Sequence, residues 1–208
     1  MKKLNKKGFT LVELIVVIAI IGVLAAILVP TLMGYVHSSR VTSADTLASD
    51  LKRNVGYFLT EADTAGYGMK KASGMNTDVT IKVVDYEWEI TVTDPTVFAE
   101  CDFKWDGVTT TVNVSTNVSA ITNADGFFAY RLLKLFPDVK NAYIGMKIHE
   151  GTCAALYIAN DTLITPTILA FDNDGWSAEV YMWNGETEAV CDEGYIVGTA
   201  PKLKLGHS

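Results

Sequence analysis

Residues 2–30 read KKLNKKGFTLVELIVVIAIIGVLAAILVP, and this stretch determines how the rest of the chain is interpreted. Four lysines precede Gly8 and Phe9, and about twenty apolar residues follow, interrupted near their start by Glu13. An apolar run of about 20 residues can span a bilayer as a helix. A charge inside such a helix costs roughly 2.5–3.5 kcal/mol, so we expect Glu13 to have a partner and a function.

Three interpretations of this segment compete. A secretory signal peptide has an apolar core of about 7–15 residues followed by a small-residue cleavage site. The run here is longer, and no such site ends it. A plain membrane anchor fits the length but leaves Glu13 and the Gly8-Phe9 junction unexplained. The third interpretation accounts for all of these features.

Residues 8–13 (GFTLVE), with the lysine-rich leader before them, resemble the processing motif of type IV prepilins. The resemblance covers about the first 60 residues and is closest to the IVa subgroup, which includes the pseudopilins. It implies that a prepilin peptidase cuts after Gly8 and methylates the new amino terminus at Phe9. It also implies that Glu13 acts in filament assembly and that Gly22 and Pro30 are helix-breaking positions.

Charge and cysteines restrict the function further. The formal charge is −7 with 17 basic and 24 acidic residues, and loss of the four leader lysines leaves 13 basic residues, a net −11. We expect no direct nucleic-acid binding, since phosphate contacts need clustered Lys and Arg. The positive-inside rule holds the leader in the cytoplasm and sends the remainder outward. The three cysteines therefore face an oxidising environment.

An odd number of cysteines allows at most one bridge within the chain. The resemblance implies a disulfide near the C-terminus, which would join Cys153 to Cys191. Cys101 is the alternative partner.

The pattern predicts an α+β fold, with a long N-terminal helix packed on an antiparallel β-sheet. We expect a cleaved leader at 1–8, a transmembrane and assembly helix at 9–33, an amphipathic continuation at 34–65 and a β-rich head domain at 66–208. Apolar residues at spacings of three and four from Ala44 to Leu59 predict the amphipathic part. We expect the helix to deform between Gly22 and Pro30 when the subunit is packed into a filament. The alternative is that Gly22 only favours helix packing in the membrane.

The head domain changes to a period of two. Alternation predicts strands at 79–83, at 86–92 with Tyr86 among the inward residues, at 144–148 and at 156–158. Further strands are expected at 97–105 and 108–118, and a helix over 125–136 with Leu135 facing inward. Later strands are expected at 167–171 and 176–183, and a hairpin turn at 184–185.

No motif supports catalysis, so we predict neither an enzyme nor a cofactor. Asp172 and Asp174 lie in an oxygen-rich DNDG sequence that is a weak candidate for calcium, since such turns are common for conformational reasons alone. The tryptophans and tyrosines allow a carbohydrate-stacking interpretation, with Trp183 the best candidate. Aromatic residues at strand spacing are more often core or filament interface.

The preferred function is a structural subunit of a type IV pilus, which would serve adhesion, motility or DNA uptake. Its expected partners are other pilin subunits, the prepilin peptidase and methyltransferase, the assembly platform with its ATPase, and the membrane. The chain would first be a single-pass precursor in the cytoplasmic membrane and then part of an extracellular pilus. The alternatives are a pseudopilin of a type II secretion or competence system and a membrane-tethered binding domain.

The cleavage site gives a direct prediction. The mature chain is expected to begin at Phe9 with a methylated amine, and Gly8→Ala is expected to leave uncut precursor in the membrane. Mass spectrometry of the purified protein checks both. An N-terminal peptide that still starts at Met1 or Lys2 in the wild-type protein would contradict the assignment.

Overall fold

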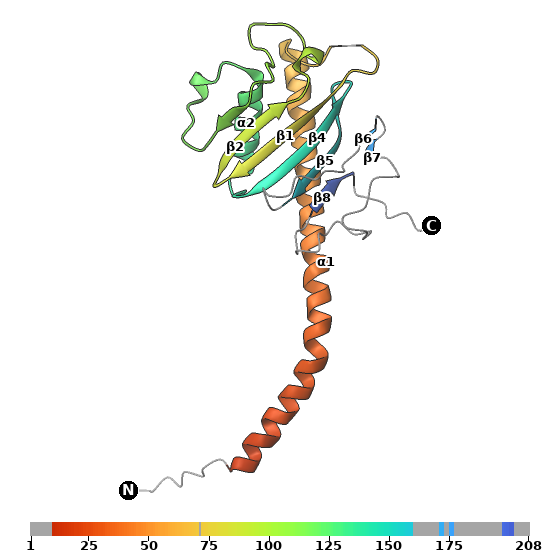
Figure 1. Cartoon of the computed structure of the whole chain (residues 1–208), viewed down its shortest axis with the longest axis vertical. Helices are drawn as coiled ribbons and strands as arrows, with labels where there is room; N and C mark the ends of the chain where they lie inside the picture. The colour runs from red at the N-terminus through yellow and green to blue at the C-terminus, as the bar shows by residue number, and fades with distance from the viewer. Residues whose placement is uncertain (1–9, 71, 160–170, 173–174, 177–196, 202–208) are drawn as a thin grey trace. The chain divides into compact units, whose positions relative to one another are not determined.

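The computed structural model describes residues 10–70, 72–159, 171–172, 175–176 and 197–201. A long helix, α1 (Leu11–Ala65), is followed by an antiparallel sheet and a second helix (Figure 1), which confirms the predicted α+β fold. The chain divides into two units, Met1–Arg40 and Val41–Ser208. The second unit contains all of the strands: β1 (Asn76–Val84), β2 (Glu87–Val92), β3 (Thr110–Val112), β4 (Ala142–His149), β5 (Thr152–Ala159), β6 (Phe171–Asp172), β7 (Gly175–Trp176) and β8 (Val197–Ala200).

The main sheet has the strand order β3-β2-β1-β4-β5-β8, and every neighbouring pair is antiparallel. Alternate residues of β1 and β2 are buried, as the period of two predicted. Val79 pairs with Val92, and Ile81 lies between Ile90 on one side and Ile144 on the other. These residues share one face of the sheet, which therefore forms one wall of the core.

Two tight hairpins set the register of the sheet. Asp85 and Tyr86 join β1 to β2, and Glu150 and Gly151 join β4 to β5. All four residues have positive φ, the conformation that two-residue type I′ turns require. Tyr86 was expected to be an inward strand residue, and this is wrong because the turn places it outside β2 and partly exposed.

The second half of α1 supplies the other wall of the core. A stripe at spacings of three and four is buried, and its members are Ala48, Leu51, Val55, Phe58, Leu59 and Ala62. This confirms the predicted amphipathic pattern. Gly66, with φ of 90°, follows the last helical residue, and a positive-φ glycine there is a common helix end.

Aromatic side chains fill the core between the sheet and the helices. The ring centroids of Phe58 and Phe128 lie 4.7 Å apart, and those of Phe98 and Trp105 lie 4.3 Å apart. The Nε1 of Trp105 donates to the Tyr67 carbonyl at 2.9 Å. Trp88 is fully buried as well. The interpretation of these two tryptophans as core residues is therefore confirmed.

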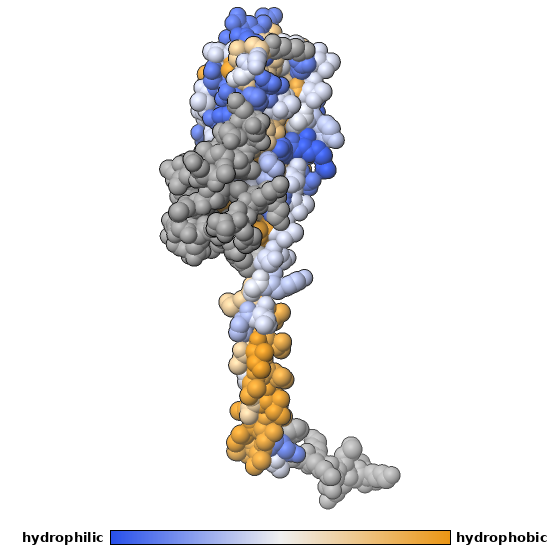
Figure 2. Space-filling view, turned by 90° about the vertical axis from the view of Figure 1, so that its right-hand side faces the viewer, coloured by the Kyte–Doolittle hydropathy of each residue, from blue (hydrophilic) through white to orange (hydrophobic). Residues whose placement is uncertain are grey.

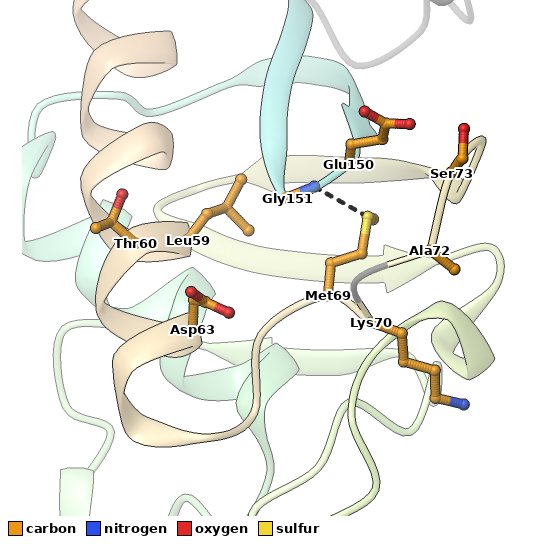
Figure 3. Close-up of a pocket in the computed structure, with 9 residues that line it drawn as sticks. All are labelled: Leu59, Thr60, Asp63, Met69, Lys70, Ala72, Ser73, Glu150 and Gly151. Atoms are coloured by element: carbon orange, nitrogen blue, oxygen red, sulfur yellow. Dashed lines mark hydrogen bonds between the residues drawn. The ribbon is translucent and has the colours of Figure 1, made fainter.

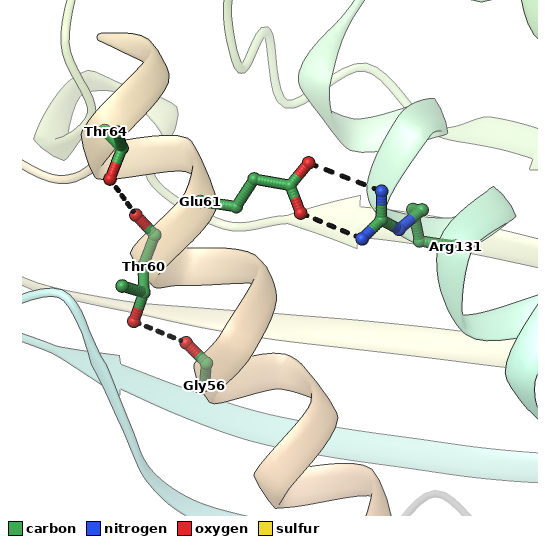
Figure 4. A network of polar contacts seen from close by, with 5 residues as sticks. All are labelled: Gly56, Thr60, Glu61, Thr64 and Arg131. Carbon is green, nitrogen blue, oxygen red and sulfur yellow. Dashed lines mark hydrogen bonds and ion pairs between the residues drawn. The ribbon is translucent and has the colours of Figure 1, made fainter.

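The helix α2 (Ala124–Leu135) packs near β2 and β3 and is joined to α1 by an ion pair. Arg131 donates to both carboxylate oxygens of Glu61, at 2.8 and 3.3 Å (Figure 4). Both side chains are about half exposed, so we expect a contribution of about 0–1 kcal/mol. On the same stretch of α1 the hydroxyls of Thr60 and Thr64 donate to carbonyls one turn earlier.

Other predictions for this region are wrong. No strand covers 97–105, where a 3-10 turn at Pro95–Val97 is followed by irregular chain. The strand expected at 108–118 is reduced to the three residues of β3, because a turn follows at once and leads to a second 3-10 turn at Val118–Ala120. Leu135 is 54% exposed at the end of α2 instead of facing inward.

The last described strand lies directly against α1. A Cβ added at Gly198 in β8 would collide with the carbonyl group of Ala44 in α1. The next residue, Thr199, donates its backbone N–H to the buried carboxylate of Asp45 at 3.1 Å. Glycine is therefore needed at position 198 because two backbones approach closely there.

We expect Gly198→Ala to destabilise the head by about 1–3 kcal/mol, because one of the two backbones must shift. Gly56→Ala is the matched control: a Cβ there has no atom within 4 Å, and helix propensity favours alanine by about 1 kcal/mol. Thermal unfolding in detergent, followed by circular dichroism, compares them. A Gly198→Ala protein that melts at the parental temperature would show that the close approach is unimportant.

A buried carboxylate in the first turn of α2 fixes the loop before β3. Asp125 is fully buried, and its Oδ2 accepts the backbone N–H of Asp106 at 2.9 Å. Its other oxygen has no hydrogen-bond partner among the described residues. Burial raises the pKa of Asp125 from its ordinary value of 3.8 to about 6, against the lowering effect of its backbone hydrogen bonds. The preceding Asn123 caps the helix by accepting from Gly126 N–H at 3.0 Å.

The raised pKa predicts how stability depends on pH. The folded protein keeps this proton up to about pH 6, whereas the unfolded chain releases it near 3.8, so stability should fall as pH rises between these values. Asp125→Asn keeps an acceptor for the Asp106 N–H without a charge and should flatten this part of the profile. Asp138→Asn, at an exposed position, is the control. An unchanged slope in Asp125→Asn, measured by denaturant unfolding from pH 4 to 7, would contradict the assignment.

Candidate assembly site

The first turn of α1 contains the carboxylate singled out in the sequence. Glu13 Oε2 accepts two hydrogen bonds from Thr10, one from its backbone N–H at 2.8 Å and one from its hydroxyl at 2.7 Å. In return, the Glu13 N–H donates to the Thr10 hydroxyl oxygen at 3.3 Å. This reciprocal arrangement is the capping box, in which Ser or Thr before a helix pairs with Glu three residues later.

The capping box gives Glu13 a partner within its own chain. The helix start carries unsatisfied N–H groups and a partial positive charge, and both favour a carboxylate there. Sequence reasoning missed Thr10, although the T-x-x-E spacing before an apolar run was a usable signal. Thr10 and Glu13 are therefore brought together by local geometry alone.

The helix that follows is apolar on every side. From Leu11 to Val36, every large apolar side chain is at least 46% exposed, and this surface is orange in Figure 2. By length and composition α1 is suited to cross a membrane. In the second half of the same helix only one stripe is apolar, and that stripe is covered by the sheet. The exposed surface of residues 11–36, hereafter the apolar helix surface, is thus without cover in the described chain.

Gly22 and Pro30 both lie within α1, which continues through them. A Cβ at Gly22 would have no atom within 4 Å, so nothing in the described chain requires a glycine there. Next to Pro30, which lacks an N–H, the hydroxyl of Thr31 donates to the Leu28 carbonyl at 2.9 Å. The proposed yielding of the helix between Gly22 and Pro30 stays a prediction.

Several predicted site residues lie outside the described part of the chain. These are Gly8, Phe9, Asp174, Trp183 and Cys191. Cleavage and methylation at Gly8 and Phe9 therefore stay predictions. Asp172 lies in β6, paired with Gly175 of β7, and the weak calcium site that it would share with Asp174 also stays untested.

The predicted disulfide between Cys153 and Cys191 is likewise untested, but the environment of Cys153 bears on how such a bridge would form. Cys153 is buried, and burial raises the pKa of its thiol to about 12. The thiolate is the reactive form in disulfide exchange, so the folded head should oxidise slowly at this position. A bridge at Cys153 would accordingly form before the head has closed around it.

The head also has a cavity of about 580 Å³ beside the end of α1 (Figure 3). Its lining residues are Leu59, Thr60, Asp63, Met69, Lys70, Ala72, Ser73, Glu150 and Gly151. The Met69 sulfur accepts from the Gly151 N–H at 3.1 Å, and Glu150 accepts from the Gly74 N–H at 2.9 Å. The lining residues include no histidine or cysteine, so they offer no nucleophile paired with an imidazole base.

Comparison with known proteins supports this description of the N-terminal helix. Residues 3–29 match the prokaryotic N-terminal methylation motif. The chain is 41% identical over 83 residues to a fimbrial protein of Moraxella nonliquefaciens, an alignment covering 36% of this chain and 54% of that protein. It is 40% identical over 75 residues to the type IV major fimbrial protein FimA of Dichelobacter nodosus, covering 36% and 46%. The N-terminal part of the chain is therefore similar to type IV fimbrial proteins.

A third relative is the fimbrial protein EcpC of Eikenella corrodens, 43% identical over 74 residues, which covers 33% of this chain and 48% of EcpC. The chain thus spans about half the length of the curated relatives it matches. No solved structure matches it. The likeness therefore applies to part of the chain.

Proposed function

We propose that the chain is a structural subunit of a type IV pilus filament, made as a prepilin, cleaved after Gly8, methylated at Phe9 and polymerised through its N-terminal helix. The observation that carries this proposal is the apolar helix surface of residues 11–36. It is supported by the methylation motif at 3–29 and by relatives named as fimbrial proteins.

Two kinds of cover suit such a surface. Apolar area gains about 25 cal/mol per Å² on leaving water, so a helix that is apolar all round must be embedded. In the precursor, lipid covers the helix and holds the head outside the cytoplasmic membrane. In the filament, the helices of neighbouring subunits cover one another. Residues 11–36 would thus first anchor the precursor in the membrane and later pack against neighbouring subunits in the filament.

Glu13 is the exception on this surface, and cleavage would give it a new partner. Removal of the leader creates an ammonium group on Phe9, and methylation keeps its charge. In an apolar surrounding, the attraction between this ammonium and Glu13 of a neighbouring subunit is several times stronger than in water, although desolvation cancels part of it. The main effect of the pair between the Phe9 ammonium and Glu13 would therefore be to set the axial register between subunits, and its contribution to filament stability would be smaller.

The remaining partners follow from this life cycle. A prepilin peptidase and methyltransferase would act on residues 8 and 9, and an assembly platform with an ATPase would move the subunit from membrane to filament. Adhesion, motility or DNA uptake would be properties of the assembled pilus. The subunit itself would have a structural role and no catalytic activity, as the names of its relatives indicate.

Substitution of Glu13 tests the proposal. Glu13→Ala is expected to be inserted and cleaved but not assembled, and Glu13→Asp, one methylene shorter, to assemble poorly. Glu13→Gln separates two roles, because its amide oxygen can accept the Thr10 N–H while the charge is lost. We expect Glu13→Gln to lose filaments as well. Blots of sheared surface fractions and electron microscopy measure assembly, and mass spectrometry of the membrane fraction measures cleavage.

Two outcomes would contradict parts of this scheme. Normal filaments with Glu13→Gln but none with Glu13→Ala would reduce Glu13 to a helix cap. Normal filaments with Glu13→Ala would remove it from assembly altogether. A wild-type protein that is cleaved but found only in the membrane fraction would contradict the pilus subunit itself.

A further inference from the structure

Two identical Asn-Val-Ser sequences follow the edge strand β3. They occupy residues 113–115 and 117–119, four positions apart. Asn-x-Ser, with any residue but proline in the middle, is the acceptor sequence for N-linked glycosylation of secreted proteins. The sequence alone does not tell which of the two copies is accessible for modification, but the structure around each copy does.

Both copies share one local conformation. Asn113 Oδ1 accepts the Ser115 N–H at 3.0 Å, and Asn117 Oδ1 accepts the Ser119 N–H at 3.1 Å. In each carboxamide the oxygen is therefore used within the turn. The nitrogen, on the other branch of the same planar group, is the atom that differs between the copies.

The first copy is tied into the head. Asn113 is partly buried, and its Nδ2 donates to Glu87 Oε1 of β2 at 3.4 Å. Its backbone N–H donates to the hydroxyl oxygen of Thr116 at 2.8 Å. A transferase would have to break these contacts before it could reach the Asn113 nitrogen.

The second copy is open. Asn117 is exposed, as are Val118 and Ser119, and the Asn117 Nδ2 makes no hydrogen bond to any residue of the described chain. Its only recorded side-chain bond is the one from Ser119. Every residue of this second acceptor sequence is therefore accessible from solvent.

The surroundings of Asn117 also give a reason for a bulky polar group. β3 is the last strand on one side of the sheet, and a strand edge without a strand partner is a site for unwanted pairing. Val108, Val114 and Val118 lie before and after this strand and are 63%, 60% and 42% exposed. A hydrated sugar on Asn117 would shield the neighbouring exposed Val114 and Val118, which matters most where copies are concentrated in a filament.

We infer that Asn117 carries an N-linked glycan and that Asn113 does not. The inference rests on the proposed function, because it needs the head outside the cytoplasmic membrane. The sugar donor would be a glycan activated as a lipid-linked diphosphate. A bond forms between Asn117 Nδ2 and the anomeric carbon while the bond from that carbon to the diphosphate oxygen breaks. The diphosphate leaves with the electron pair, and a base takes one amide proton.

Peptide mass spectrometry of protein sheared from the cells that produce it tests the inference. Electron-transfer fragmentation should place a sugar mass on Asn117 and none on Asn113. Mild alkali, which releases sugars from Ser and Thr, should leave it in place. Asn117→Gln and Ser119→Ala should each remove the mass completely, whereas Ser119→Thr and the matched control Asn113→Gln should retain it. Melting curves check that each variant folds.

The results separate this inference from the proposed function. A bare Asn117, a sugar released by alkali, or a sugar on Asn113 with Asn117 bare would each overturn it. The same digest reports the amino terminus. A methylated Phe9 together with a bare Asn117 overturns the glycan and leaves the pilus subunit standing, whereas an uncut Met1 terminus and a bare Asn117 in wild-type protein overturn both.

Discussion

The structure depends on one constraint: a single helix must be compatible with two different surroundings. Residues 11–36 expose apolar side chains in every direction, while from Ala48 to Ala62 only one stripe is apolar and the sheet covers it. The first pattern requires lipid or other helices around it, and the second requires one folded domain on one side. The sequence of α1 thus assigns each half its own environment, and the core of the head contains no residue of the apolar helix surface.

Three carboxylates of the chain each accept a backbone N–H group. Near the start of α1, Glu13 is held by Thr10, so a costly charge in an apolar segment already has two hydrogen bonds in the single chain. In the head, Asp45 and Asp125 are buried but accept backbone N–H groups of Thr199 and Asp106. In each case the carboxylate fixes an element: a helix start, the last strand, or the loop before β3.

Periodicity predicted most of this fold. The stripe on α1, the strands β1, β2, β4 and β5 and the helix α2 were all recognisable because each repeats its apolar residues over enough positions. The segment from 97 to 120 was not, since its Thr and Val content favours strands while short polar turns at Asp94, Asn113 and Asn117 interrupt them. Tyr86 was misplaced because a positive φ at a tyrosine leaves no mark in the sequence. In the assembly site, Glu13 was recognised from the sequence because a charge inside an apolar helix is energetically unfavourable. The spacing of three residues between Thr10 and Glu13 was overlooked.

The contact between β8 and α1 has a consequence for the order in which the molecule is made. Asp45 and Thr199 are 154 positions apart in the chain, and Gly198 lies against Ala44. During synthesis α1 emerges first, and β8 emerges only after β1 to β7 have been made. Contacts of such long range form late and slow folding. The sheet must therefore stay incomplete until β8 has been made, and a chain interrupted before β8 would leave the edge of β5 and this side of α1 without their partner.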